Sequence, residues 1–314
     1  MRIVSLVPGG TEIVYALGLG DQLVGVSADS DWPAEVARLP KLTESALNSE
    51  GMSSAEIDAA VSETARAHDG RGLYHMDRDL LRALRPDLVL TQEVCEVCAL
   101  SGRDLGAVAE TLGYVPQVVS LNASTLEQVW EDVESVGLAA EVAQRAVELV
   151  VDLQGRLEIL RQRAAHQERP RVCCLEWLDP PFSAGHWVPE MVEIAGGEDR
   201  LGSRGGYSQR LDWDDVVAYR PQVLVLIPCS VSLEQVAAEF ESLRARPGWA
   251  DLPAVRRGMV FAGETHLFSQ AGPRLVDGVN ALARMLHPAV FRDPLVAGQA
   301  LKVSDDGLRL DAYC

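Results

Sequence analysis

The sequence predicts an α/β protein of two similar lobes with mainly parallel sheets, joined by one long backbone helix. Three observations predict it. Short apolar runs alternate with helical patterns, two segments recur in the same order, and the longest helical pattern lies between the copies. Apolar runs without alternation are typical of parallel strands covered on both faces. A chain of 314 residues also exceeds what one core usually supports, which favours two domains.

Seven apolar runs rich in Val, Ile and Leu mark the expected strands. In chain order they are Ile3 to Val7, Leu23 to Val26, Leu88 to Leu90, Val118 to Leu121, Val172 to Leu175, Val223 to Ile227 and Met259 to Phe261.

Internal similarity indicates that the lobes are copies of one unit. The segment DRDLLRALRPDLVLTQEVC from Asp77 resembles DWDDVVAYRPQVLVLIPCS from Asp212, since each reads as an acidic helix start, an Arg-Pro stop and a buried strand. A second pair, TEIVYALGLGDQLVG from Thr11 and PEMVEIAGGEDRLG from Pro189, shares a short helix ended by glycine. Both pairs come in the same order in each half.

A helical pattern over Glu141 to His166 separates the copies, and Pro170 closes it. Such a helix is about 39 Å long. A capping box at Ser124-x-x-Glu127 predicts the start of a preceding helix. The apolar stripe of the long helix recurs every three or four residues: Val142, Ala146, Leu149, Leu153, Leu157 and Leu160.

These signals divide the chain into four parts. We expect an N-terminal lobe at 1–124, a connecting helical segment at 125–168, a C-terminal lobe at 169–288 and a tail at 289–314 without assigned structure. The segment 43–72 has no counterpart in the second half. Its capping box, Ser53-x-x-Glu56, predicts a helical insertion packed on the first lobe.

Composition narrows the function classes. The chain is 47% hydrophobic and 24% charged, as soluble globular proteins are, and its net charge is −18 without a Lys/Arg cluster in the sequence. We therefore expect neither nucleic acid nor anionic lipid as a partner. The first residues show no signal-peptide pattern and no run is long enough for a membrane span, which predicts a cytoplasmic protein without membrane insertion.

Candidate ligand-binding residues follow the expected strands, because ligands of open parallel sheets bind beyond the carboxyl ends of the strands. Aromatic residues make up only 5% of the chain, yet five of them fall in these segments, which favours the wall of a site for a large, flat or apolar ligand. The alternative is that each ring packs under its own lobe. The five are Trp32, Trp177, Phe182, Trp187 and Phe268, and Tyr207 is added from its position in a loop.

Two histidines and two cysteines extend the set. His186 and His266 also follow strands, where they could ligate a metal ion or the metal of a bound cofactor. The alternative is that each is a hydrogen-bonded residue at the surface. Cys95 and Cys98 form a CxxC with metal or redox spacing, although no second CxxC exists. The nucleotide and nucleophile motifs G-x-G-x-x-G, G-x-x-x-x-G-K-[ST] and G-x-S-x-G are absent from the sequence. No nucleophile–base arrangement emerges.

The chain from about Arg2 to His287 resembles the Fe/cobalamin periplasmic-binding family, most of all its cobalamin-binding members. The segments that carry the resemblance are IVSLVPGGTEIVYALGLGDQLVGVSADSDWP, LLRALRPDLVL and LDPPFSAGHWVPEMVEIAGG. The resemblance implies a class III periplasmic-binding-protein fold, with the ligand in the cleft between the lobes. It also implies corrin contacts at Trp32, Phe182, His266 and Phe268, and docking of an ABC transporter through Asp79 and Asp214.

We therefore predict a non-catalytic protein that binds a corrinoid such as cobalamin by aromatic stacking, with His186 or His266 as a possible axial ligand. The absence of a secretion signal makes the membrane subunit of an ABC transporter a doubtful partner. One alternative is a metal- or thiol-dependent protein, an enzyme among the options, that uses Cys95 and Cys98 together with Cys229 or a histidine. Another is a haem- or siderophore-binding protein on the same fold.

Overall fold

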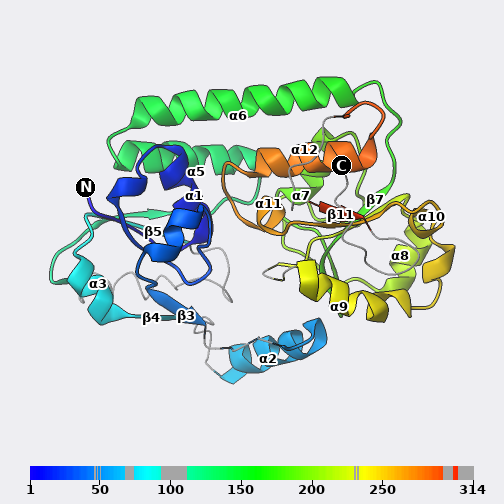
Figure 1. Ribbon diagram of the computed structural model, residues 1–314, viewed down its shortest axis with the longest axis horizontal. Helices are drawn as coiled ribbons and strands as arrows, with labels where there is room; N and C mark the ends of the chain where they lie inside the picture. The colour runs from blue at the N-terminus through cyan, green and yellow to red at the C-terminus, as the bar shows by residue number, and fades with distance from the viewer. Residues whose placement is uncertain are drawn as a thin grey trace. The chain divides into compact units, whose positions relative to one another are not determined.

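The computed structural model describes residues 1–45, 47, 49, 51–67, 74–92, 112–229, 231, 233–292 and 300–302. The chain forms two compact units, each with its own sheet (Figure 1). Unit 1 comprises Met1–Met52, Glu56–Asp152 and Ala271–Pro273, and unit 2 comprises Ser53–Ala55, Leu153–Gln270 and Arg274–Cys314.

Unit 1 is built on a four-stranded sheet of order β2-β1-β5-β6 in which every pairing is parallel. Val4, Leu81 and Val89 belong to its buried core. The strands are β1 (Ile3–Ser5), β2 (Leu23–Val26), β5 (Leu88–Thr91) and β6 (Gln117–Ser120). The helices around them are α1 (Pro8–Ala16), α3 (Arg78–Leu84), α5 (Leu126–Ala139) and the 3-10 turns η1 (Gly20–Gln22) and η2 (Ala34–Arg38).

The predicted insertion contains the helix α2 (Ser54–Ala67). It is flanked by β3 (Thr43–Ser45) and β4 (Tyr74–Met76), which pair in antiparallel orientation. The helix from Glu56 onward belongs to unit 1, and residues 53–55 at its start belong to unit 2. There the Ser54 backbone N–H donates to Glu239 Oε1 at 2.9 Å.

The long connecting helix is α6 (Ala143–Ala164), two residues shorter at each end than predicted. Its buried positions keep the helical period: Ala146, Val150, Leu153, Leu157, Leu160 and Ala164. The preceding helix α5 begins one residue later than its expected capping box. Thr125 is the N-cap and accepts from Gln128 N–H, while Gln128 Oε1 accepts from Ser124 N–H at 2.7 Å.

Unit 2 has a five-stranded sheet of order β11-β10-β9-β7-β8, parallel in its centre and antiparallel at both edges. The tail thus contributes an edge strand. The strands are β7 (Val172–Leu178), β8 (Pro181–Ser183), β9 (Val223–Leu226), β10 (Val260–Gly263) and β11 (Ala300–Lys302). The helices are α7 (Val188–Ile194), α8 (Trp213–Tyr219), α9 (Leu233–Arg244), α10 (Pro253–Arg256), α11 (His266–Ser269), α12 (Leu275–Leu286) and the 3-10 turn η3 (Trp249–Asp251).

The predicted repeat is present in the geometry of both units. Asp77 and Asp212 are the N-caps of α3 and α8, and each side chain accepts a backbone N–H of the first turn. Both helices end at an arginine in the left-handed conformation, Arg85 with φ 45° and Arg220 with φ 54°. Proline follows each of them, and a fully buried strand comes next.

The strand pairing repeats as well. The parallel trio β1-β5-β6 corresponds to β7-β9-β10, and an isolated parallel bridge between Arg171 and Glu198 stands where β2 pairs with β1. All seven predicted strands are confirmed, and no strand end differs from its predicted residue by more than three positions. In the described part of the chain, no helix combines the length and apolar character required to cross a bilayer.

Candidate functional site

Strand β7 carries an irregularity where the sequence predicts ligand contacts to begin. Leu175 pairs with Ser183 and Trp177 with Phe182, so two residues of β7 oppose one of β8 around Glu176. A bulge of this kind re-aims side chains and is frequent beside functional sites. After the bulge, Leu178 joins Cys173 and Leu175 in the core of unit 2. Glu176 therefore points away from that core side.

Trp177 and Phe182 are direct partners across the β7–β8 hairpin. Directly paired residues place their side chains on the same face of the sheet, within contact distance. Both are partly exposed. The Trp177 indole also packs at the edge of the unit 2 core and donates from Nε1 to the Ser54 carbonyl oxygen at 3.1 Å. Two of the predicted aromatic residues are thus direct register partners.

The loop 203–210 runs beside this hairpin and brings further side chains to it. His186 N–H donates to Gly206 O at 2.6 Å, and Gly205 N–H donates to His186 O at 2.8 Å. Gly185 makes the approach possible, since a Cβ there would lie 2.4 Å from Ser208 N. The loop thereby places Tyr207, which is 63% exposed, next to His186.

His186 has a φ of 51°, a left-handed conformation that is uncommon outside glycine and often marks functional positions. Its ring meets Tyr207 edge-on with centroids 5.5 Å apart, and the Trp187 ring also lies 5.5 Å away. Burial lowers the pKa of the His186 imidazole. The ring is therefore neutral near pH 7, which is the form that binds metals.

Glu176 lies beneath this loop, and sequence reasoning did not select it. Its Oε1 accepts from Gly185 N–H at 3.1 Å and its Oε2 accepts from Ser208 Oγ. Burial raises the pKa of the Glu176 carboxyl to about 7, while the hydrogen bonds from Ser208 and Gly185 act in the opposite direction. The carboxyl is consequently divided between its charged and neutral forms near neutral pH.

His266 begins α11 at the end of β10 and holds several partners. Its Nδ1 lies 2.7 Å from Gln270 Nε2, and its Nε2 lies 3.6 Å from Glu264 Oε1. Both ring nitrogens therefore face polar groups within unit 2. The contacts given for the His186 ring are with aromatic rings, whereas both ring nitrogens of His266 have polar neighbours.

Trp187 and Phe268 have a packing role in the structure. Trp187 is 6% exposed and donates from Nε1 to the Phe268 carbonyl oxygen at 2.6 Å. Phe268 is 1% exposed, and its ring lies against Gly263, where a Cβ would come within 2.7 Å of it. Both rings are thus buried within unit 2. This agrees with the alternative that an aromatic residue after a strand packs under its own lobe.

The carboxyl edge of the unit 1 sheet carries a hydroxyl cluster instead of an aromatic pair. Ser30 Oγ lies 3.0 Å from Thr11 Oγ1 and 2.7 Å from Ser27 Oγ, and Lys41 Nζ donates to Ser30 O. All three hydroxyl residues are buried. Trp32 follows this cluster and is 39% exposed.

The cysteine prediction falls on Cys95 and Cys98, which lie outside the described residues. Of the described cysteines, Cys173 and Cys174 are buried and Cys229 is exposed. Burial raises the pKa of the Cys173 and Cys174 thiols, so neither is a reactive thiolate. Within the part of the chain that the structure describes, no group of three or more His, Cys, Asp or Glu could hold a metal ion.

Asp79 and Asp214 occupy equivalent places in the repeat, two residues after the N-caps of α3 and α8. Both are exposed. Asp79 accepts from Arg82 Nη1 at 2.6 Å.

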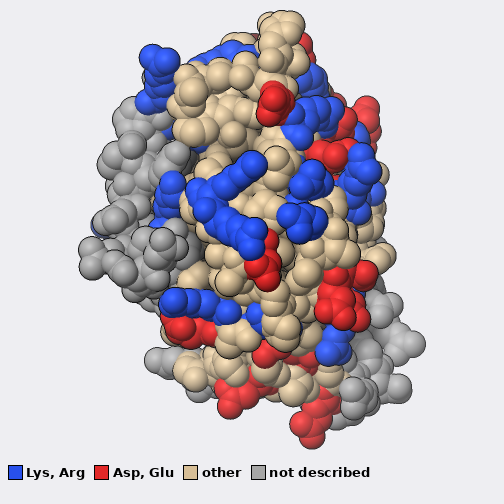
Figure 2. All heavy atoms as spheres, turned by 90° about the vertical axis from the view of Figure 1, so that its right-hand side faces the viewer, with Lys and Arg blue, Asp and Glu red and all other residues tan. Residues whose placement is uncertain are grey.

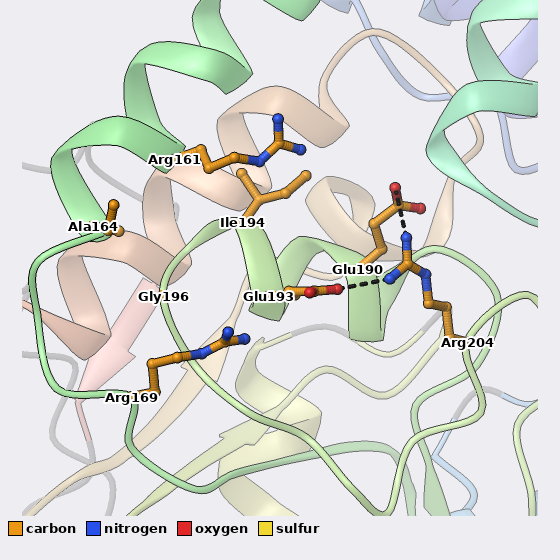
Figure 3. Close-up of a pocket in the computed structure, with 9 residues that line it drawn as sticks. Arg161, Ala164, Arg169, Glu190, Glu193, Ile194, Gly196 and Arg204 are labelled. Carbon is orange, nitrogen blue, oxygen red and sulfur yellow. Dashed lines mark hydrogen bonds and ion pairs between the residues drawn. The ribbon is translucent and has the colours of Figure 1, made fainter.

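Unit 2 also contains a pocket of about 370 Å³ away from the hairpin, between the end of α6 and α7 (Figure 3). Its charged side chains have structural partners. Arg204 pairs with Glu193 at 2.7 Å and Glu190 at 3.4 Å, and Arg169 donates to Gly197 O beyond the end of α7. Arg161 pairs with Glu158 at 2.8 Å. Each of the three arginines thus has a partner within unit 2.

The space-filling view shows a face on which Lys and Arg side chains gather in the middle, despite the net charge of −18 (Figure 2). Asp and Glu side chains lie mostly toward the rim of this face.

Comparison with known proteins places these observations in a family. A family model described as periplasmic binding protein matches residues 3–265, which is most of the chain. The chain belongs to the periplasmic binding protein family. The predicted family resemblance and the class III periplasmic-binding-protein fold are thereby confirmed. Members of this family are binding proteins, so the non-catalytic assignment is confirmed too, and an enzyme is removed from the alternatives.

Three similar proteins illustrate the family. An ABC transporter substrate-binding lipoprotein of Bacillus subtilis is 26% identical over 93% of this chain and 82% of its own length. A vitamin B12-binding protein of Vibrio cholerae is 25% identical over 91% of this chain and 88% of its own. A periplasmic haem-binding protein of Pseudomonas aeruginosa has a TM-score of 0.72 and 24% identity, and the match covers 96% of this chain and 98% of that one.

The predicted cytoplasmic location is wrong. One similar protein is a lipoprotein and another is periplasmic, so the relatives work outside the cytoplasm. The expectation rested on the first residues of the sequence, and family membership outweighs it. The doubt about a transporter that followed from it loses its basis.

Sequence reasoning missed Glu176, Ser208 and Arg210, which the hairpin and its neighbouring loop bring together. Glu176 directly precedes Trp177, and a polar residue at the end of a buried strand was the available signal. Ser208 and Arg210 lie in a loop without an apolar pattern. Their proximity depends on Gly185, which sequence alone does not relate to position 208.

Proposed function

We propose that the protein binds a corrinoid of the cobalamin type and delivers it to an ABC transporter. The observation that carries the proposal is the pairing of Trp177 with Phe182 beside His186 and Tyr207 at the edge of the unit 2 sheet. A similar protein that binds vitamin B12 and matches over nearly the full chain supports the same ligand class.

The residues suit a flat macrocycle with a central metal. Partly exposed rings at Phe182 and Trp177 offer apolar faces for stacking, and Tyr207 adds a ring with a polar end. A neutral His186 imidazole supplies the axial ligand in this proposal. Trp32 of unit 1 is a further proposed contact, whereas the buried Trp187 and Phe268 hold the shape of unit 2.

Haem is the rival ligand. The fold is shared with a haem-binding protein, so the fold alone does not decide between the two macrocycles. Both are flat, carry a metal and accept an imidazole. The corrinoid has the stronger support, because the vitamin B12-binding protein is similar to this chain in sequence over 91% of its length.

Visible absorbance tests the proposal. Hydroxocobalamin added to the purified full chain is expected to shift its absorbance bands when an imidazole replaces the axial hydroxide or water. His186→Ala is expected to abolish the shift. His166→Ala, which removes an exposed histidine elsewhere in unit 2, should leave it intact. Equal shifts in both variants would remove His186 from the axial position, and no shift in the unchanged chain would remove axial ligation altogether.

We further propose that Asp79 and Asp214 dock the transporter. Their equivalent positions on α3 and α8 give one exposed acid in each unit, on a helix that belongs to the repeat. Paired acids of this kind suit basic side chains on a partner surface.

A further inference from the structure

Arg210 lies opposite Phe182, on a third backbone segment next to the Trp177–Phe182 register pair. An isolated antiparallel bridge joins Phe182 to Arg210 on the side of β8 that faces away from β7. Ser183 N–H donates to Gln209 O and Leu211 N–H donates to Pro181 O, both at 2.8 Å. These bonds flank the bridge and leave Phe182 and Arg210 as a non-hydrogen-bonded pair, the arrangement in which side chains come closest.

Trp177, Phe182 and Arg210 therefore form a row across three adjacent backbone segments. Because each residue is directly opposite the next, all three side chains lie on the same face. A flat ligand stacked on Phe182 would have an indole on one side and a guanidinium on the other. The guanidinium would meet the rim of the ligand rather than its face.

Arg210 is exposed and, among the described residues, makes no ion pair. Other arginines of unit 2 are engaged: Arg246 pairs with Asp179 at 2.8 Å and Arg204 with Glu193 at 2.7 Å. The chain has a net charge of −18, and the Arg210 guanidinium makes no ion pair with a described carboxylate. It lies in the same row as two partly exposed aromatic residues, where it can bind an anionic group of a ligand. A guanidinium fork matches phosphate and carboxylate oxygens in particular.

We propose that Arg210 is a specificity-determining residue that binds an anionic group on the rim of the macrocycle stacked at Phe182. This inference rests on the proposed function and narrows its ligand class to macrocycles that carry a phosphate or a carboxylate at the periphery. Cobalamin presents a phosphodiester in its nucleotide loop, and haem presents two propionates. A macrocycle without such a group loses the contact.

The test pairs each ligand with a version that lacks the anion. Calorimetry on the full chain compares hydroxocobalamin with cobinamide, which lacks the phosphodiester, and haemin with its dimethyl ester. Arg210→Gln is expected to weaken binding of the ligand that carries the peripheral anionic group about tenfold and leave binding of the version without that group unchanged. Arg244→Gln is the control, because it removes an exposed arginine from α9 in the same unit.

The outcomes separate this inference from the proposed function. If the unchanged chain binds hydroxocobalamin but Arg210→Gln binds it equally well, or weakens cobinamide by the same factor, the role of Arg210 is overturned and corrinoid binding stands. A weakening confined to haemin, with its dimethyl ester unaffected, supports Arg210 and assigns the anion to a carboxylate. Failure of the unchanged chain to bind any of the four ligands contradicts both proposals.

Discussion

Trp177 of β7 and Phe182 of β8 are register partners, held opposite one another by a hairpin whose turn is only Asp179 and Pro180. The pairing places both side chains on one face of the sheet, next to its β8 edge. On the side of β8 that faces away from β7, the isolated bridge to Arg210 continues the row. The hairpin thus combines a rigid backbone with partly exposed aromatic surface.

Replacement of the Phe182 ring tests this surface. Phe182→Ala is expected to lower the affinity for hydroxocobalamin about tenfold, since a stacked aromatic contact and its buried area are lost. Phe182→Leu keeps much of the apolar volume but has no flat face, so its affinity for hydroxocobalamin should lie between those of Phe182→Ala and the unchanged chain. Calorimetry measures both. Unchanged affinity in Phe182→Ala would exclude stacking at this position.

Trp187 is expected to affect stability and not ligand affinity. Trp187→Phe leaves the Phe268 carbonyl oxygen without its indole donor and opens space in unit 2, which should cost about 1 to 3 kcal/mol. Urea unfolding measures the loss. Trp32→Phe, at an exposed ring, should change stability little. A large drop in hydroxocobalamin affinity for Trp187→Phe, with stability unchanged, would restore Trp187 to the ligand wall.

Glu176 makes stability depend on pH. Its pKa is raised from 4.5 to about 7 in the folded protein, so between these values the native state holds the proton more tightly than the unfolded chain. Stability should therefore fall as pH rises from 5 to 8. For Glu176 alone the fall is about 2 kcal/mol. Asp199, whose pKa burial raises to about 6, acts in the same direction.

Glu176→Gln isolates the contribution of that carboxyl. The variant keeps an oxygen for Gly185 N–H but cannot ionise, so its unfolding free energy should fall less between pH 5 and pH 8 than that of the unchanged chain. Urea unfolding at both pH values gives the comparison. Parallel pH profiles for the two proteins would show that Glu176 has an ordinary pKa in the folded state.

The proposed docking role of Asp79 and Asp214 has a readout that is separate from ligand binding. Asp79→Lys and Asp214→Lys should each weaken association with the detergent-solubilised transporter and leave calorimetric affinity for hydroxocobalamin unchanged. Asp251→Lys provides a matched control, because Asp251 is also exposed and also pairs with a neighbouring arginine. Equal association in all three variants would place the docking surface elsewhere.

The sequence predicts the fold well because its signals are local. The Arg-Pro stops after α3 and α8, the acidic N-caps and the buried strands that follow all lie within about 15 residues of each other in each copy. Errors occur where a neighbouring residue competes for the same role. Thr125 takes the N-cap that Ser124 was expected to fill, because Gln128 can serve both residues.

The site is predicted less completely, since burial depends on contacts between distant segments. The sequence pattern of a tryptophan after a strand does not show whether the side chain is exposed, like Trp32, or buried, like Trp187. The buried Trp187 indole donates to the Phe268 carbonyl oxygen, 81 residues away. Arg210 likewise gains its place only through its bridge to Phe182. Such relationships are not visible as a pattern in one sequence.

A calorimetric titration of the unchanged full chain with hydroxocobalamin, run beside one with haemin, tests the central claim most directly. The account predicts saturable binding of hydroxocobalamin at one molecule per chain and at micromolar or lower concentration, tighter than haemin. Absence of heat with hydroxocobalamin, or saturable binding of haemin alone, would contradict it.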